Sequence, residues 1–495
     1  MQSPPASDPS GVAPVAHRLL ALIAGVEFFV LAATASQYGY HRDELYFLAA
    51  GQHLSWGYPD QPPFVPALAR IIDSVAPGSL FALRLPSALA AAAVVVITGL
   101  LAREFGGGRG AQALAAGSMA IGAFVLGSGH LLSTSTFDLL AWTALLWLIV
   151  RTLRTDNDWL WLVTGFVAGL GLLDSNLVGF LMAAFVAGLL IAGPRRSLRT
   201  PWPWAGGVVA AVMWAPYVAW QARHGWPQFE VSRAIAAGRS GSSQPRWLFI
   251  PYQFGLISPF LAPVWIVGLV QLFRSPRLRW CRSIGWAYVV LTVVFIATGG
   301  KAYYIAGMFA VLLAVGAQPT VERMKRNQST LTRVAVGAAF VLSTGSAIIT
   351  LPLIPVHSLH NTPVVDANYD AGETVGWPTY VREIASVYRP GEVILTSNYG
   401  EAGAVGRFGG ALGLPEAFSG QTGYWYWGPP PEGADRVLAV GFDHGTLSDS
   451  FEQCDLAVRL DNHLDVDNDE QRAPVWSCSR PKQSWVDMWP RFRDT

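Results

Sequence analysis

Repeated apolar stretches constrain this 495-residue chain more than any other feature. A helix needs about 20 predominantly apolar residues to cross a bilayer, and eleven stretches of roughly that length precede residue 352. They lie near residues 18–37, 85–102, 110–128, 132–150, 159–174, 176–193, 204–221, 247–273, 283–299, 302–318 and 332–351. The pattern predicts a mainly α, polytopic membrane protein with about eleven transmembrane helices.

The composition supports this fold class and disfavours several functions. Charged residues make up 14% of the chain, against about 25% in a typical soluble domain. Lys and Arg number 34 and Asp and Glu 33, so no basic excess indicates a nucleic-acid partner. The sequence contains no Gly-Lys-Ser/Thr phosphate loop, which argues against an ATP-driven pump. No nucleotide-sugar site is evident either.

Basic residues fall in alternate loops, which predicts the orientation. Short cytoplasmic loops carry an excess of Lys and Arg. With the N-terminus inside, the inside loops hold Arg103, Arg109, Arg151, Arg154, Arg195, Arg196, Arg199, Arg274, Arg277, Arg279, Arg282, Arg323, Lys325, Arg326 and Arg333. We therefore expect a multi-pass cell-membrane protein with a cytoplasmic N-terminus. The longer outside loops are residues 38–84 and 222–246.

The two ends of the chain differ from its middle. Residues 1–14 are rich in Pro and Ser and are expected to be a disordered tail, and residues 15–351 form the transmembrane domain. Beyond residue 351 the apolar runs shorten to strand length, at 393–396, 437–441 and 456–460, after a helix near 376–388. Residues 352–495 therefore read as an extracytoplasmic soluble α/β domain. Cys454 and Cys478 could form a disulfide there, which the sequence leaves open.

The first outside loop carries the most informative residues. Asp43 and Glu44 lie just past the first span, where carboxylates are costly unless they are paired or functional. An amphipathic stretch follows them, and Pro62 and Pro63 fix a second turn. The loop is therefore expected to be ordered.

Residues 41–63 of this loop, HRDELYFLAAGQHLSWGYPDQPP, resemble a known family. The pattern is similar to the bacterial protein-mannosyltransferase-like and aminoarabinose-transferase-like membrane glycosyltransferases of the GT-C class, family 39-like. The resemblance continues through residues 133–138, 169–174, 220–226, 300–304, 397–403 and 424–428. It implies a GT-C-like helical bundle as the catalytic domain.

The resemblance also implies a reaction. An inverting glycosyltransferase of this kind moves a hexose or pentose from a polyprenyl-phosphate donor to an acceptor in the cell envelope, which can be protein, lipid or glycan. A carboxylate on the first outside loop removes the proton from the acceptor hydroxyl. By position that carboxylate is Asp43, with Glu44 beside it.

The departing lipid phosphate needs positive charge near it. The candidate residues for binding substrate are Arg42, His53, Asp60, Gln61, Asp138, Arg223, His224, Lys301, Tyr303 and Tyr304. Related transferases often carry Lys before the Pro-Pro pair, where this chain has Gln61. Some relatives bind a divalent ion through an acidic residue and a histidine, and Asp60 with His224 could do so here. The sequence leaves metal dependence open.

Structural roles compete with each of these functions. Asp43 and Glu44 could only cap a helix, Asp60 could form a turn, Asp138 could bond neighbouring hydroxyls, and Lys301 could extend to the interface. A transporter or flippase of lipid-linked sugars, or a non-catalytic envelope scaffold, is the alternative. Transporters often show related repeats in their two halves, and none stands out here. The sugar, the acceptor and the oligomeric state stay open.

Overall fold

A computed structural model describes residues 12–239, 243–327 and 329–494 of the chain. Residues 1–11 of the expected disordered tail lie outside the described residues. The chain divides into two compact units. The first, called the helical unit, comprises residues up to Ala35, Arg84–Ala219 and Ile235–Leu351. The second, called the mixed unit, comprises Ser36–Leu83, Trp220–Ala234 and Pro352–Thr495.

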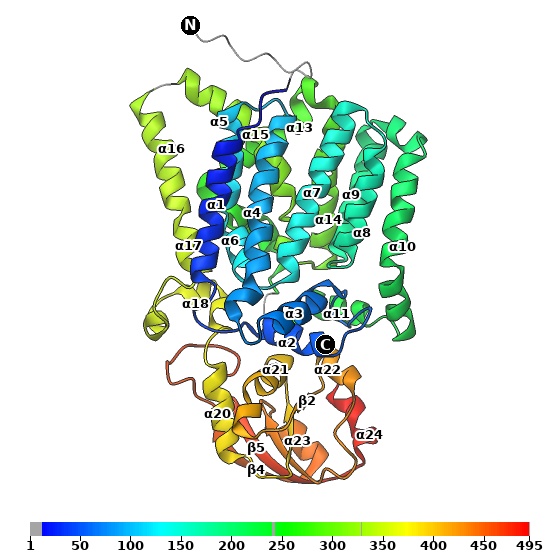
Figure 1. The fold of residues 1–495 in the computed structure, drawn as a ribbon, viewed down its shortest axis with the longest axis vertical. Coiled ribbons are helices and arrows are strands. Elements are labelled where there is room, and N and C mark those ends of the chain that lie inside the picture. The colour runs from blue at the N-terminus through cyan, green and yellow to red at the C-terminus, as the bar shows by residue number, and fades with distance from the viewer. Residues whose placement is uncertain (1–11, 240–242, 328, 495) are drawn as a thin grey trace. The chain divides into compact units, whose positions relative to one another are not determined.

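Apolar helices of different lengths, most of which run side by side, build the helical unit (Figure 1). They are α1 (His17–Thr34), α4 (Leu80–Glu104), α5 (Arg109–Ala120), α6 (Ala123–His130), α7 (Thr134–Thr155), α8 (Leu160–Leu172), α9 (Leu177–Ala192), α10 (Trp202–Arg223), α12 (Phe249–Ile257), α13 (Ala262–Arg274), α14 (Arg282–Thr298), α15 (Met308–Arg326), α16 (Thr330–Ser343) and α17 (Gly345–Thr350). Each predicted span overlaps one of these helices or a consecutive pair of them. The prediction of a helical membrane domain is therefore confirmed.

Fewer helices of the structure are long and apolar enough to be spans than the eleven apolar stretches of the sequence predict. Among the described residues, five helices are long and apolar enough to cross a membrane, and seven if each bent pair is one span. The bent pairs are α5 with α6, at 57°, and the two helices on either side of Ser258, at 85°. Helices α8 and α9 are apolar but shorter. The count of about eleven spans stays a prediction.

Glycines let the helices approach closely at the centre of the helical unit. Residues Met308 to Ala317 of α15 are all buried, as expected of a helix that is apolar on every side. A Cβ atom added at Gly268 of α13 would overlap the carbonyl oxygen of Leu312, and one at Gly316 would overlap that of Val264. Small residues at such crossings allow backbones to touch, so α13 and α15 depend on both glycines.

The mixed unit contains one five-stranded sheet of order β2-β1-β3-β5-β4. Its strands are β1 (Val393–Thr396), β2 (Ala417–Ser419), β3 (Arg436–Val440), β4 (Phe451–Arg459) and β5 (Pro474–Pro481). Strand β1 is parallel to β2 and β3, whereas β5 is antiparallel to β3 and β4. The predicted strands and the predicted helix, α20 (Trp377–Val387), are present. Cys454 and Cys478 face each other on β4 and β5 and are joined by a disulfide.

Further helices of the mixed unit come from segments far apart in the sequence (Figure 1). They are α2 (Arg42–Gln52), α3 (Phe64–Val75), α11 (Pro227–Ala236), α18 (Val364–Ala367), α19 (Tyr369–Gly372), α21 (Tyr399–Phe408), α22 (Thr422–Trp427), α23 (His444–Ser450) and α24 (Trp485–Met488). Helix α2 packs on α3 and α21, and Gly403 of α21 lies against the backbone of Leu45. The first loop thus packs with the C-terminal segment, whereas its place in the sequence had grouped it with the transmembrane domain.

We predict that Gly268→Ala destabilises the protein strongly, because the new methyl group would overlap a backbone oxygen of α15 that cannot move independently. The expected loss is at least about 2 kcal/mol, measured as a lower unfolding temperature of the detergent-purified protein. Gly337→Ala on α16 is the matched control, since a Cβ atom there meets nothing within 4 Å. Equal unfolding temperatures for the two variants would contradict the close crossing of α13 and α15.

Candidate active site

Helix α2 begins with three charged residues, Arg42, Asp43 and Glu44, and each has a different set of contacts. His41 is the N-cap residue, and its backbone N–H donates to the Glu44 carboxylate at 2.8 Å. Glu44 is fully buried and completes a capping box with His41, an arrangement that satisfies free backbone donors at a helix start. The side chain of Asp43, by contrast, is 45% exposed. Glu44 therefore has a structural contact, whereas Asp43 remains accessible.

Two carboxylates of the first loop each accept a hydrogen bond from a tyrosine. The Tyr399 hydroxyl donates to Oδ1 of Asp43 at 2.6 Å, and the Tyr46 hydroxyl donates to Oδ1 of Asp60 at 2.8 Å. The two phenol rings are in contact, with centroids 5.2 Å apart. Both tyrosines thus connect Asp43 and Asp60 into one cluster, which we call the carboxylate–tyrosine cluster.

The two carboxyl groups of the cluster differ in their surroundings. Burial raises the pKa of Asp60 to about 7, with a smaller contribution from the negative charge of Asp43, although the hydrogen bond from Tyr46 opposes the rise. A pKa near neutrality is common among groups that take part in binding or catalysis. Asp60 therefore exchanges its proton close to neutral pH.

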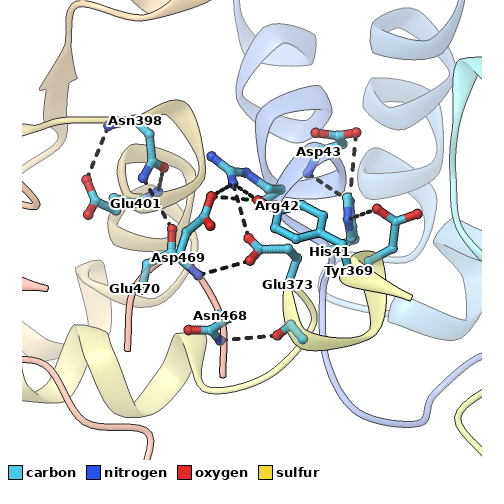
Figure 2. A network of polar contacts seen from close by, with 12 residues as sticks. His41, Arg42, Asp43, Tyr369, Glu373, Asn398, Glu401, Asn468, Asp469 and Glu470 are labelled. Atoms are coloured by element: carbon cyan, nitrogen blue, oxygen red, sulfur yellow. Dashed lines mark hydrogen bonds and ion pairs between the residues drawn. The ribbon is translucent and has the colours of Figure 1, made fainter. Parts of the chain in front are cut away.

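Arg42 lies at the centre of a buried polar network (Figure 2). Its guanidinium forms ion pairs with Asp469 at 2.5 Å and Glu373 at 3.2 Å, and it donates to the Tyr369 hydroxyl at 2.7 Å. The side chains of Arg42 and Glu373 are 11% and 0% exposed. Arg42 was predicted to bind substrate from its position in the loop, and that role stays a prediction. In the structure, acidic residues of the C-terminal segment match its positive charge.

The other predicted residues of the mixed unit occupy separate positions. His53 ends α2 and stacks on Trp427 with ring centroids 4.2 Å apart. Gln61 is buried, and neither polar atom of its amide has a hydrogen-bond partner among the described residues. Arg223 is exposed near the end of α10, and the ring of His224 stacks on Trp220 at 4.0 Å.

The remaining predicted residues belong to the helical unit. Lys301 precedes a short helical turn (Ala302–Ile305), and its amino group lies 5.8 Å from the ring centroid of Tyr303. Tyr303 and Tyr304 contact each other, and Tyr304 interacts electrostatically with Asp138. Asp138 is buried on α7 and interacts electrostatically with Asp174. Lys301, Tyr303, Tyr304 and Asp138 thus form a second group.

The described residues were compared with the ligand sets that metal ions require. Within the ranges that the structure describes, no group of three or more His, Cys, Asp or Glu side chains could hold a metal ion. The pair suggested by the sequence, Asp60 and His224, has other contacts: Asp60 accepts from Tyr46, and Nδ1 of His224 lies 2.8 Å from the carbonyl oxygen of Trp220. Metal dependence stays open.

Reasoning from sequence missed the tyrosines and the acidic partners of Arg42. Tyr399 lies in the run 397–403, which resembles the family, so that motif was the available signal. Tyr46 lies within the first-loop motif itself. Glu373 and Asp469 are more than 300 residues from Arg42 and belong to no recognised motif, so nothing local indicated their contact.

Comparisons with known proteins agree with this fold. The family model described as dolichyl-phosphate-mannose-protein mannosyltransferase matches residues 60–220. No curated protein sequence matches the chain. The structure is similar to ArnT from Cupriavidus metallidurans bound to undecaprenyl phosphate, with a TM-score of 0.61, 15% identity and coverage of 93% of this chain and 97% of that one.

Two further structures share the fold. ArnT from Cupriavidus metallidurans in the apo state gives a TM-score of 0.59 at 15% identity, and the match covers 93% of this chain and 97% of that one. The arabinofuranosyltransferase AftD from mycobacteria gives 0.53 at 14% identity, where 96% of this chain spans 40% of that one. The chain therefore has the fold of GT-C membrane glycosyltransferases, and the resemblance that the sequence predicts is confirmed.

We predict that Arg42→Met destabilises the protein by about 3–5 kcal/mol, because it leaves the buried carboxylate of Glu373 without its counter-charge. The unfolding temperature of the purified protein measures this loss. Arg480→Met is the control: Arg480 pairs with Glu452 where both side chains are more than half exposed, so its change should stay below about 1 kcal/mol. Equal effects of the two changes would contradict a structural role for Arg42.

We predict that the stability of the protein falls between pH 5.5 and pH 8 and that Asp60→Asn reduces this fall. A carboxyl group whose pKa is higher in the folded state binds more protons there, so its contribution to stability decreases as the pH rises toward that pKa, which is about 7 for Asp60. Unfolding temperatures at the two pH values measure the effect. Asp73→Asn is the control, because Asp73 lies on the same loop as Asp60 and pairs with Arg407 of α21. An unchanged pH dependence in Asp60→Asn would contradict the assignment.

Proposed function

We propose that this protein is an integral membrane inverting glycosyltransferase with Asp43 as its general base. The GT-C fold and the match to a mannosyltransferase family model support the proposal. The donor is a sugar on a polyprenyl phosphate, and the acceptor is an extracytoplasmic hydroxyl of a protein, lipid or glycan. The observation that carries the proposal is the half-exposed Asp43 carboxylate, fixed at the start of α2 within the carboxylate–tyrosine cluster.

The three acidic residues of the first loop differ in how well they suit this role. A general base must reach the proton that it removes and must be ionised when it does so. Glu44 is buried in its capping box, and Asp60, with a pKa of about 7, is only partly ionised at neutral pH. Asp43 is accessible and supports the assignment best.

The proposed reaction needs one proton transfer. The acceptor oxygen attacks the anomeric carbon of the donor, and the bond from that carbon to the phosphate oxygen breaks. The electron pair of this bond leaves with the lipid phosphate, and the hydroxyl proton passes to Asp43. Attack opposite to the leaving group inverts the anomeric carbon.

Binding of the lipid phosphate requires positive charge near it. Arg42 is a poor choice because its guanidinium pairs with Glu373 and Asp469. Arg223, an exposed residue of the mixed unit, supports this role best, and Lys301 stays a prediction from the sequence. Gln61 supports a substrate contact nearby, since a buried amide without hydrogen bonds is costly and a sugar hydroxyl would satisfy it.

The neighbours with solved structures support the substrate class. The ArnT structure contains undecaprenyl phosphate, a lipid of the kind that the proposed donor carries, and the family model names dolichyl-phosphate mannose. Both name a phosphorylated polyprenyl-type lipid. We extend that chemistry to this chain, with the C-terminal segment on the outer face.

Transport of lipid-linked sugars is the second candidate, and one observation favours it. Glu27 on α1 is buried, and neither of its carboxylate oxygens has a hydrogen-bond partner among the described residues. Ionisable groups inside spanning helices often mark transport pathways. One isolated carboxylate is weaker support than the loop cluster, so we place this function second.

We predict that Asp43→Asn lowers sugar transfer by 10²–10⁴-fold, about the range for loss of a general base. Membranes containing the protein are incubated with radiolabelled polyprenyl-phosphate sugars, and label entering the acceptor is counted at equal expression. Asp73→Asn is the matched control and should transfer normally. Equal transfer by Asp43→Asn and wild type would move the base to Asp60 or Glu44. Movement of the lipid-linked sugar across the bilayer without transfer would favour the transporter.

A further inference from the structure

We infer that Tyr399 is a positioning residue: its hydroxyl holds Oδ1 of Asp43 so that Oδ2 is the oxygen that receives the acceptor proton. This inference rests on the proposed function and assigns a specific task to the C-terminal segment. The segment then supplies part of the reaction centre in addition to packing on the first loop.

The backbone of Tyr399 is fixed by the start of helix α21. Asn398 is the N-cap residue, and it forms a capping box with Glu401. The backbone N–H of Tyr399 donates to Oε1 of Gln421 at 3.1 Å. A residue held at a capped helix start varies little in direction, so the phenol reaches Asp43 from a defined position.

The ring of Tyr399 is held from two sides. The Arg42 guanidinium lies 5.0 Å from its centroid, and the ring of Tyr46 contacts it at 5.2 Å. Cation–π and aromatic contacts of this kind orient a ring as well as bind it. Since Arg42 is itself paired with buried Glu373, the position of the Tyr399 hydroxyl is tied to the whole polar network.

The charge state of Tyr399 makes it a donor. Burial, together with the negative charge of Asp43, raises the pKa of its phenol well above the ordinary range, with Arg42 acting in the opposite direction. The Tyr399 hydroxyl therefore keeps its proton and donates a hydrogen bond to the Asp43 carboxylate. Hydrogen bonds to an ionised acceptor are stronger than neutral ones, so Asp43 has one preferred orientation.

The second oxygen of Asp43 has only a longer contact, an ion pair with His41. Oδ2 lies 3.8 Å from Nδ1 of His41, beyond hydrogen-bond distance, and the side chain is 45% exposed. One oxygen is thus fixed by Tyr399 while the other is accessible. Fixing a base in this way lowers the cost of reaching the geometry for proton removal.

The test removes the hydroxyl and keeps the ring. Tyr399→Phe preserves the contacts with Arg42 and Tyr46, so we expect unchanged unfolding temperature, unchanged KM for the polyprenyl-phosphate sugar and a kcat about 10-fold lower, the effect of one hydrogen bond to a charged group. Tyr380→Phe is the matched control. Its hydroxyl donates to Asn468 in the same unit, and its kcat should stay within about 2-fold of wild type.

A double-variant cycle separates positioning from structure. Asp43→Glu moves the carboxylate along the side chain and away from the Tyr399 hydroxyl, so Tyr399→Phe should cost little further activity in that background. A full and additive loss there would overturn the inference, as would wild-type kcat in Tyr399→Phe alone. A lower unfolding temperature with raised KM would assign the residue to structure.

Failure of this inference is distinguishable from failure of the proposed function. If Asp43→Asn abolishes transfer while Tyr399→Phe transfers at the wild-type rate, only the positioning role is wrong. If Asp43→Asn transfers normally, the proposed base is wrong, and Tyr399 has no carboxylate base to position.

Discussion

The buried charge of Arg42 is the constraint on which the mixed unit depends. A guanidinium removed from water is tolerated only when counter-charges and hydrogen-bond acceptors surround it. Glu373, Asp469 and the Tyr369 hydroxyl supply them, and all three come from the C-terminal segment, whereas Arg42 comes from the first loop. Neither segment can fold into this arrangement without the other. The first loop and the C-terminal segment therefore act as one structural unit despite the intervening membrane spans.

Helix geometry gives the three residues that begin α2 different environments. Successive residues of a helix point about 100° apart, so Arg42, Asp43 and Glu44 face different surroundings although they are neighbours in the chain. Arg42 faces the acidic network, Glu44 closes the helix start, and Asp43 meets Tyr399 at an accessible position. Once Arg42 is held, the direction of Asp43 follows. The ion pairs of Arg42 and the placement of the Asp43 carboxylate are thus coupled through a single turn of helix.

Local signals made much of the fold predictable, and non-local contacts account for what was missed. The spans follow from apolar length, and β1, β3 and β4 follow from short apolar runs. Strand β2 has only three residues, and β5 mixes prolines and polar residues, so neither carries a strand pattern. The first-loop motif led to Asp43 and Asp60. Capping by Glu44 was an alternative that the sequence offered beside its catalytic role. The pairing of Arg42 with Glu373 and Asp469 depends on contacts that residue type and spacing do not encode, and Arg42 was therefore predicted only as a substrate-binding residue.

Two carboxylates in one cluster cannot share the same environment if one of them is to act as a base. Ionising both at close range within aromatic surroundings is unfavourable, so neighbouring acids titrate apart. Here burial raises the pKa of Asp60 to about 7, and the side chain of Asp43 is half exposed. The cluster thus holds one accessible carboxylate, which suits the proposed general base, and a second acid that can donate hydrogen bonds near neutral pH.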